Sequence, residues 1–304
     1  MFMYIVFILL GCRENASIED RCIFGDCDFI LKLEELQIDF VTISSGLEPL
    51  ERYSLSNDFY MMTTEVTQGM FYSIQGYDSH KEYYSVLGDG VDFPAYYVNW
   101  HMAADFANAL TSYHNEMMGT DVQKCYECTK SGNIHVSCVV EKENPYECDG
   151  YRLPTDAEWE YAARSGTKSD FWTGQGTEQG GNISDDICFE SVLIEDGVNN
   201  PPLSDYAWFC YTDTTHVVAQ KKSNDFGLYD MHGNVWEWVH DGFDCEFPVD
   251  DIDPYCLSEN SFRTGRGGSF FVFPSYGQAS SRYSADTNRR DGSIGFRIVR
   301  KNLD

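Results

Sequence analysis

The spacing of apolar residues predicts three helices. In the segment that follows residue 100, apolar residues recur every three or four positions, which is the period of a helix with one buried face. These residues are Met102, Ala103, Phe106, Ala109 and Leu110. A second helix is expected after Thr155, because Thr155 and Glu158 have the spacing of a capping box. A short helix is expected from Gln68 to Ile74, with Gly76 ending it.

The remaining patterns predict short strands and loops. Residues 39–44 alternate apolar and polar side chains, as a half-buried strand does, and residues 58–66 mix aromatic and branched side chains. Residues 77–93 are expected to form a loop. From residue 165 onward, glycine, aromatic and polar residues dominate, with few helical stretches. The patterns therefore predict an irregular α+β domain with little regular secondary structure.

The beginning of the chain predicts an export signal. Residues 2–10 are apolar without interruption, which is far short of the roughly 20 residues that a spanning helix needs. Residues 9–12 read Leu-Leu-Gly-Cys and are similar to a bacterial lipobox, in which Cys12 is lipidated. No Lys or Arg precedes the apolar run, although a secretory signal usually has one. We expect residues 1–12 to be the signal, residues 13–37 an acidic linker, and residues 38–300 the domain.

The eleven cysteines indicate disulfides rather than a zinc site. Without Cys12, ten remain, and they fall in local groups. The groups are Cys22 and Cys27; Cys125, Cys128, Cys138 and Cys148; Cys188 and Cys210; and Cys245 and Cys256. A structural zinc site pairs two close couples of ligands, whereas Cys138 and Cys148 stand apart. Even, local grouping is typical of an oxidising compartment. The four cysteines of the insert at residues 119–150 could pair in more than one way.

The charge balance excludes some partners. With 49 acidic and 21 basic residues the net charge is −28, and a field of that sign repels nucleic acid and anionic membranes. We expect no nucleic-acid partner, and contact with a membrane only through a lipid anchor. Abundant carboxylates suit Ca²⁺, which prefers oxygen ligands, although most of them serve only to keep the surface solvated.

Four motifs follow one another along the chain. They are FYMMTTEVTQ (59–68), YRLPTDAEWEYAAR (151–164), GLYDMHGNVWEW (227–238), and RGGS (266–269) with GFR (295–297). Together they resemble the formylglycine-generating enzyme family, also called sulfatase-modifying factors. The resemblance covers roughly residues 38–300 and implies a fold related to C-type lectins, with little regular structure.

The resemblance also locates an active centre. The best-known members of that family oxidise a sulfatase cysteine to formylglycine with oxygen and copper. They use two cysteines, at the third and eighth positions after the serine of the RGGS motif. In this chain those positions are Val272 and Gly277, and no cysteine follows Cys256. Soft sulfur ligands suit Cu(I), and neither side chain supplies one. We therefore expect no copper and no formylglycine chemistry by that mechanism.

The other residues of these motifs, which we call the frame of the family site, are retained. Arg266 and Arg297 are expected to form structural ion pairs, because arginines in a core require partners. Ser269 matches a serine near the active centre of the family, and we expect it to be a hydrogen-bond partner rather than a catalyst. Tyr276 and Arg282 are expected to line a cleft together with Ser269, Val272 and Gly277, or to cover the core.

Structural calcium is the second property that the resemblance implies. The matching loop would use the side chains of Asp230 and Glu237 and the backbone carbonyls of Gly233 and Val235. Alternatively, Asp230 and Glu237 cap turns and pair with arginines. A second site would begin at Asn182 and Ile183, with Asp205 as a further candidate, in a stretch that departs from the family pattern.

The histidines and tryptophans of the same region suggest no catalytic centre. His232 and His240 are eight residues apart and have no third ligand at the usual spacing, and His216 stands alone. Core packing is the expected role of Trp236 and Trp238 beside the loop.

Three functions of different classes remain. We expect first an exported, non-catalytic binding module in the bacterial cell envelope, secreted or lipid-anchored, with a protein or glycan ligand, because loops on a rigid frame carry binding in many folds. The alternative is an oxidoreductase that works without the two cysteines. Some relatives in this family use metal-binding histidines instead, but this chain has only seven histidines. A purely architectural envelope protein is also compatible with the sequence.

Overall fold

The computed structural model describes residues 28–33, 36–81, 87–141, 144–174, 203–210, 212–246, 251–258 and 260–303. Within these residues the fold combines three α-helices with many short strands, as the sequence patterns predict. The helices are α1 (Gln68–Gln75), α2 (Trp100–Met118) and α3 (Asp156–Arg164), with short 3₁₀ turns η3 (Pro145–Glu147), η4 (Leu203–Asp205) and η5 (Pro274–Gly277). The strands are β1 (Phe29–Leu33), β2 (Leu36–Ile43), β3 (Gly46–Leu47), β4 (Tyr53–Leu55), β5 (Phe59–Met62), β6 (Tyr126–Lys130), β7 (Val136–Val140), β8 (Trp236–Gly242), β9 (Asp251–Ile252), β10 (Phe262–Arg266), β11 (Tyr283–Asp286), β12 (Ile294–Gly295) and β13 (Val299–Lys301).

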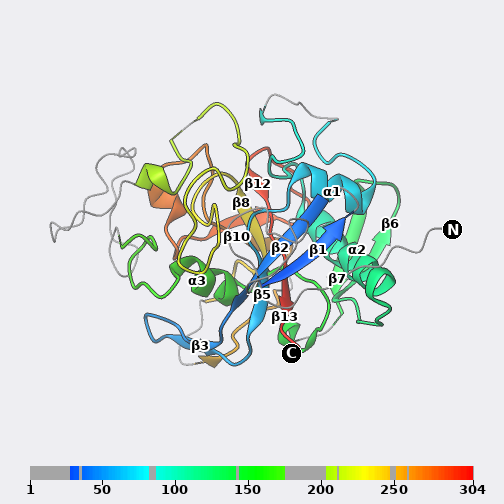
Figure 1. Ribbon diagram of the computed structural model, residues 1–304, viewed down its shortest axis with the longest axis horizontal. Coiled ribbons are helices and arrows are strands. Elements are labelled where there is room, and N and C mark those ends of the chain that lie inside the picture. The colour runs from blue at the N-terminus through cyan, green and yellow to red at the C-terminus, as the bar shows by residue number, and fades with distance from the viewer. Residues whose placement is uncertain are drawn as a thin grey trace, which may run out of the picture.

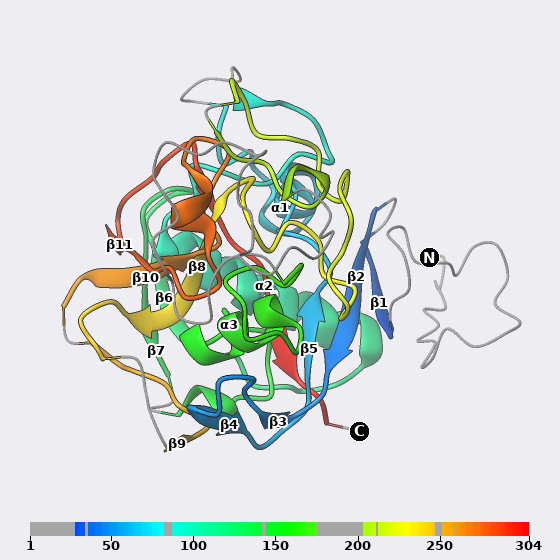
Figure 2. The same cartoon turned by 90° about the vertical axis from the view of Figure 1, so that its left-hand side faces the viewer.

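Two four-stranded sheets form the centre of the molecule. Their strand orders are β1-β2-β5-β13 and β11-β10-β8-β12, with only the β12–β8 pair parallel. A three-stranded sheet, β3-β4-β9, lies at one end of the molecule, toward the bottom of Figure 2. Both sheets of four join strands that lie far apart in the sequence, so the C-terminal β13 closes the sheet that the N-terminal strands begin.

The alternation along β2 and β5 explains how the helices are arranged. Phe40 and Met62 are paired in register and belong to the core cluster that contains α1 and α2, whereas Val41 and Met61 belong to the cluster that contains α3. Successive strand residues point to opposite faces of a sheet, so both faces of this sheet are buried, each by one of the two clusters. Figure 1 accordingly shows α1 and α2 on one side of these strands and α3 on the other.

The helices begin and end where the sequence places their caps. Thr67 caps α1 and Gly76 ends it in a left-handed conformation. At α3 the capping box of Thr155 and Glu158 is complete, as predicted. The N-terminal boundary differs from the expectation, because β1 and the start of β2 lie within residues 13–37. The acidity of those residues predicts a linker, but the apolar Phe29 and Leu31 of β1 pack into the core.

The cysteine-rich insert forms a β-hairpin that is attached to α2. Strands β6 and β7 pair antiparallel, and the disulfides Cys125–Cys148 and Cys128–Cys138 join all four cysteines of the insert. The predicted preference for disulfides over zinc is therefore confirmed here. Cys245 is bonded to Cys256, and Cys210 is disulfide-bonded as well. Residues 1–12 with Cys12, and also Cys22, Cys27 and Cys188, lie outside the described residues.

The predicted ion pairs of the buried arginines are confirmed. Arg297 donates to both carboxylate oxygens of Glu237, at 2.6 and 2.7 Å. Arg266 pairs with Asp156 and Glu160. Both guanidinium groups are fully buried, so each motif arginine is held by carboxylates and is not a surface group. No helix in the described part of the chain is long and apolar enough to cross a membrane.

Candidate functional site

The segment that follows β10 forms a tight turn that buries its serine. Gly267 and Gly268 have φ angles of 90° and 78°, which a residue with a side chain adopts only with strain. A Cβ atom on Gly268 would also lie 2.8 Å from the Cα atom of Gly277. Ser269 is fully buried, and its hydroxyl accepts a hydrogen bond from the Phe271 N–H at 3.3 Å. The geometry gives Ser269 a role in shaping this turn.

The positions that match the two cysteines of the family are occupied by an apolar contact. Gly277 is buried against Phe209, and a Cβ atom at position 277 would lie 2.1 Å from the Phe209 Cζ atom. Val272 is half-buried and packs against the cluster to which Phe209 belongs. The phenyl ring therefore fills the space that a side chain at position 277 would need.

A sulfur-bearing residue nevertheless lies beside this contact. The Cys210 N–H donates to the Val272 carbonyl oxygen at 2.8 Å. Cys210 is disulfide-bonded and packs against the same small cluster as Val272. The sequence places Cys210 in a group with Cys188, and no spacing in the sequence connects Cys210 with Val272. The pairing of residues 210 and 272 is a long-range contact that one sequence does not reveal.

The other two residues expected to line the cleft differ in their surroundings. Tyr276, in η5, is 48% exposed. Arg282 pairs with Asp156 at 2.8 Å and donates to the Gly242 and Cys245 carbonyl oxygens. It lines a separate small cavity beside the Cys245–Cys256 disulfide. Arg282 therefore connects the end of β8 to α3.

The loop expected to bind calcium is buried, and its two carboxylates have different partners. Both oxygens of Glu237 are engaged, by Arg297 and by the Trp159 indole N–H at 2.7 Å. Asp230 accepts from the Ala219 N–H through Oδ2, whereas its Oδ1 has no hydrogen-bond partner among the described residues. Asn182 and Ile183 of the second expected site lie outside the described residues.

One acidic residue near this loop was missed in the sequence. Both carboxylate oxygens of Glu65 are buried without a hydrogen-bond partner in the described structure. Burial, reinforced by the charges of Asp230 and Glu237, raises the pKa of Glu65 well above its usual range. Burial also raises the pKa of Asp230 to about 6. Unpartnered carboxylate oxygens suit a hard cation, so Asp230 and Glu65 fit calcium better than Glu237 does. Among the described residues, no group of three or more His, Cys, Asp or Glu is arranged to hold a metal.

The histidines and tryptophans of this region make packing contacts, although His216 is only half-buried. Trp238 is fully buried and donates to the Val98 carbonyl oxygen at 2.9 Å, and Trp236 stacks on Tyr283. His232 hydrogen-bonds through Nδ1 to the Gly277 carbonyl oxygen at 2.7 Å. His216 stacks on Trp208. These contacts give each ring a packing role, as expected for the tryptophans.

Burial keeps His240 neutral, and this predicts its response to acid. Burial, with the charges of Arg152 and Arg263, lowers the pKa of His240 to about 3, whereas an unfolded histidine titrates near 6.5. We expect the His240 ring to show no NMR titration between about pH 7 and about pH 4.5. In that pH window the imidazole of His240 gains a proton in the unfolded chain but not in the folded protein. The contribution of His240 to the free energy of unfolding therefore decreases as the pH falls. His240→Gln should flatten the pH dependence of stability. A His240 titration above about pH 6 would contradict this prediction.

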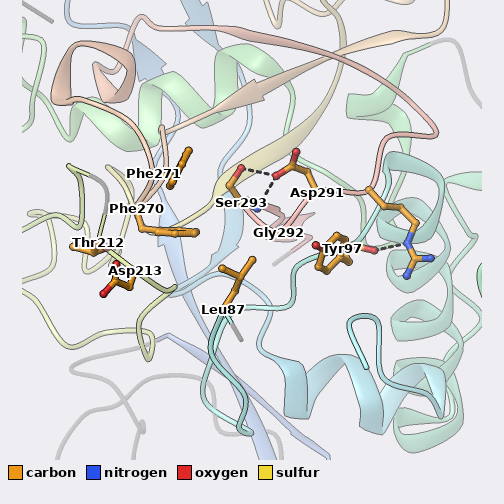
Figure 3. A pocket seen from close by; sticks show the side chains of 10 residues that line it. Leu87, Tyr97, Thr212, Asp213, Phe270, Phe271, Asp291, Gly292 and Ser293 are labelled. Carbon is orange, nitrogen blue, oxygen red and sulfur yellow. Dashed lines mark hydrogen bonds between the residues drawn. The ribbon is translucent and has the colours of Figure 1, made fainter. Parts of the chain in front are cut away.

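A larger pocket opens beside the buried turn. Its volume is about 410 Å³, and four loops that are distant in the sequence contribute to it. Figure 3 shows Phe270 and Phe271 on one side and Leu87 and Tyr97 on another, with Thr212 and Asp213 near Phe270. The lining residues are Leu87, Tyr97, Thr212, Asp213, Phe270, Phe271, Arg290, Asp291, Gly292 and Ser293. No motif or spacing in the sequence indicates this pocket, because its lining residues come from separate loops.

Similarity to known proteins assigns the family. The sulfatase-modifying factor enzyme 1-like domain matches residues 29–302. The chain therefore belongs to the sulfatase-modifying factor family, which confirms the resemblance of the four motifs and extends it to β1.

Individual relatives agree with this assignment. Chaperone protein LppX of Paenibacillus barcinonensis is 28% identical over 279 residues, which cover 86% of this chain and 89% of that protein. The formylglycine-generating enzyme of Streptomyces coelicolor is 32% identical over 161 residues, 49% of this chain and 46% of the enzyme, so the match spans about half of the enzyme's length. The structure of Treponema denticola variable protein 1 superimposes with a TM-score of 0.65, at 23% identity, over 90% of this chain and 98% of that one. That similarity shows the shared fold.

Proposed function

We propose that this protein is an exported binding module of the sulfatase-modifying factor family and does not generate formylglycine. The contact between Phe209 and Gly277 carries the proposal. The two positions at which relatives hold copper through sulfur carry Val272 and Gly277, and the second is packed against an aromatic ring. The frame around them, including the buried arginine ion pairs, is intact. A retained scaffold without the thiolates suits binding better than redox chemistry.

The proposed ligand is a protein or a glycan, bound at the loops. The pocket beside Phe271 is built entirely from loops on the rigid sheets, which is where binding residues concentrate in many folds. The relative from Paenibacillus barcinonensis is named a chaperone protein, and this supports a protein partner. Calcium and a ligand, without copper, are then the expected bound species.

An assay of oxygen consumption tests the proposal directly. The purified protein, reduced and then titrated with Cu(I), would be incubated with a sulfatase-derived peptide that contains cysteine. We expect no oxygen uptake and no formylglycine in the peptide by mass spectrometry, while an active formylglycine-generating enzyme run in parallel shows both. Turnover by this protein at a comparable rate would refute the non-catalytic proposal.

Attachment to the cell envelope is a further part of the proposal. The disulfides of the described residues suit an oxidising compartment, and residues 9–12 are similar to a lipobox. Mass spectrometry of the protein from membranes should find Cys12 as a lipidated N-terminus. Cys12→Ser should release the protein from the membrane fraction. Recovery of unmodified Cys12 within an intact N-terminus would contradict the anchor.

The second candidate function is that of an oxidoreductase that does not use the two family cysteines. The observation that favours it is the 2.8 Å contact of Cys210 with Val272, which places a disulfide-bonded cysteine next to the first of those positions. Metal analysis of the purified protein separates the two functions. Stoichiometric copper or iron would favour the oxidoreductase, and calcium alone would favour the binding module.

Calcium binding at the buried loop leads to a prediction on stability. We propose that Asp230 and Glu65, whose free carboxylate oxygens lie in this region, contribute to the site, with the carbonyl oxygens of Gly233 and Val235. A ligand that binds only the folded state at 100 times its Kd stabilises by about 2.7 kcal/mol. We expect Ca²⁺ to raise, and EGTA to lower, the unfolding temperature of the wild type. Asp230→Asn should lose this response, and Asp225→Asn, at an exposed position, should keep it. A wild type that does not respond to Ca²⁺ would refute the site.

A further inference from the structure

Of the charged side chains that line the pocket beside Phe271, two are engaged by other groups of the protein and one is not. Arg290 donates to the carbonyl oxygens of Tyr97 and Ser79, at 2.7 and 2.6 Å, so its guanidinium group is engaged by the backbone. Asp291 accepts from Ser293 and pairs with Arg289. Asp213 is exposed and makes no hydrogen bond or ion pair with the described residues. Asp213 is therefore the carboxylate that remains available to a ligand.

Aromatic side chains form the apolar part of the same pocket. Phe271 is 56% exposed, which is a large exposure for phenylalanine; Phe270 lies beside it, and Tyr97 lies on another side of the pocket (Figure 3). The face of an aromatic ring carries negative potential and attracts cations. Exposed aromatic surface beside an available carboxylate is thus complementary to a group that is both positively charged and apolar.

The walls of the pocket are fixed before a ligand arrives. Tyr97 has a φ angle of 56°, an unfavourable conformation for a residue with a side chain. Two hydrogen bonds hold it there: its N–H donates to the Asp291 carbonyl oxygen at 3.0 Å, and its own carbonyl oxygen accepts from Arg290. The Thr212 N–H donates to the Phe270 carbonyl oxygen at 3.2 Å. Strain that neighbouring groups hold in place is common at binding sites, and a preformed pocket reduces the entropy lost on binding.

We propose that this pocket binds an organic cation, an ammonium or guanidinium group carried on an apolar chain. The charged group lies toward Asp213, and the chain lies against Phe271 and Phe270. The net charge of −28 attracts such a ligand from solution. The volume of about 410 Å³ is sufficient for a side chain such as lysine or a small free amine. This inference rests on the proposed binding function and names the chemistry of its ligand.

Titrations with matched probes test the charge requirement. N-acetyl-lysine methylamide and choline would each be titrated by ligand-observed NMR, with the neutral N-acetyl-norleucine methylamide as control. We expect both cations to bind, and the norleucine compound to bind at least about fivefold more weakly. Raising the salt from about 0.05 M to about 0.5 M should weaken the binding of the cations. A glycine-flanked lysine peptide that binds more tightly than choline would identify a protein side chain as the source of the cation, and the reverse order a free amine.

Two exposed residues allow the site to be located without disturbing the fold. Asp213→Asn and Phe271→Ala should each weaken cation binding about fivefold. Asp121→Asn and Phe262→Ala are matched controls at exposed positions outside the pocket, and they should bind as the wild type does.

Two results would overturn the inference: equal binding of the norleucine compound, or cation binding that Asp213→Asn and Phe271→Ala leave unchanged. Binding of neutral oligosaccharides without any cation binding would also overturn it, and would leave the binding module itself in place. Turnover in the oxygen-consumption assay, by contrast, refutes the proposed function whatever the cation titrations show.

Discussion

Gly277→Ala is expected to destabilise the protein by about 3 kcal/mol, the upper part of the range for overpacking a core. A Cβ atom at position 277 would lie 2.1 Å from Phe209 Cζ and 2.4 Å from Phe209 Cε1. Phe209 is fully buried, so its ring can move only by displacing other core residues. The free energy of unfolding in urea, with the disulfides intact, measures the effect.

A double-mutant cycle shows whether the clash with Phe209 is the cause. Phe209→Ala alone should cost about 3–5 kcal/mol, because it leaves a cavity. In the Phe209→Ala background, Gly277→Ala should cost less than about 1 kcal/mol, since the added methyl group enters the vacated space. An equal cost of Gly277→Ala in both backgrounds would show that the glycine is required for another reason and that the Phe209 ring is not what excludes a side chain at position 277.

The sequence predicted the local features of this region and missed the partners. The ion pairs of Arg266 and Arg297 and the capping box of α3 depend on neighbouring residues or on the rule that buried charges are paired. The loss of the two cysteines was also visible from the motif. Phe209 and Cys210 belong to a segment that departs from the family pattern. No motif therefore indicated that Phe209 packs against Gly277 or that Cys210 lies beside Val272.

The partners of the buried carboxylates could likewise not be predicted from the sequence. Glu237 was one of two carboxylates expected to bind calcium, and the alternative that it pairs with an arginine describes its contacts in the structure. Glu65 belongs to the first family motif, but nothing in its spacing showed that it would be buried near Asp230. The pocket beside Phe271 was missed because residues from four separate loops line it, and only the packing of the sheets brings those loops together.

Arg152→Met is expected to cost about 4 kcal/mol of unfolding free energy, because removing one member of a buried ion pair leaves an unpaired charge. Arg152 and Glu158 are each 1% exposed, and both Arg152 terminal nitrogens donate to the Glu158 carboxylate, at 2.6 and 2.7 Å. Both residues belong to the family motif at residues 151–164. A large loss of stability would show that this motif is retained to hold the frame.

Two further variants separate the unpaired charge from the loss of side-chain packing. In the double variant Arg152→Met with Glu158→Gln, the charge is gone while the amide oxygen can still accept the Thr155 N–H bond of the capping box. We expect it to regain about half of the stability lost. Lys222→Met removes an exposed pair with Asp205, whose side chains are 62% and 44% exposed, and should cost less than about 1 kcal/mol. If Arg152→Met cost no more than Lys222→Met, the buried arginines would not stabilise the frame, and retention of the motif would instead favour a catalytic or ligand-binding role for it.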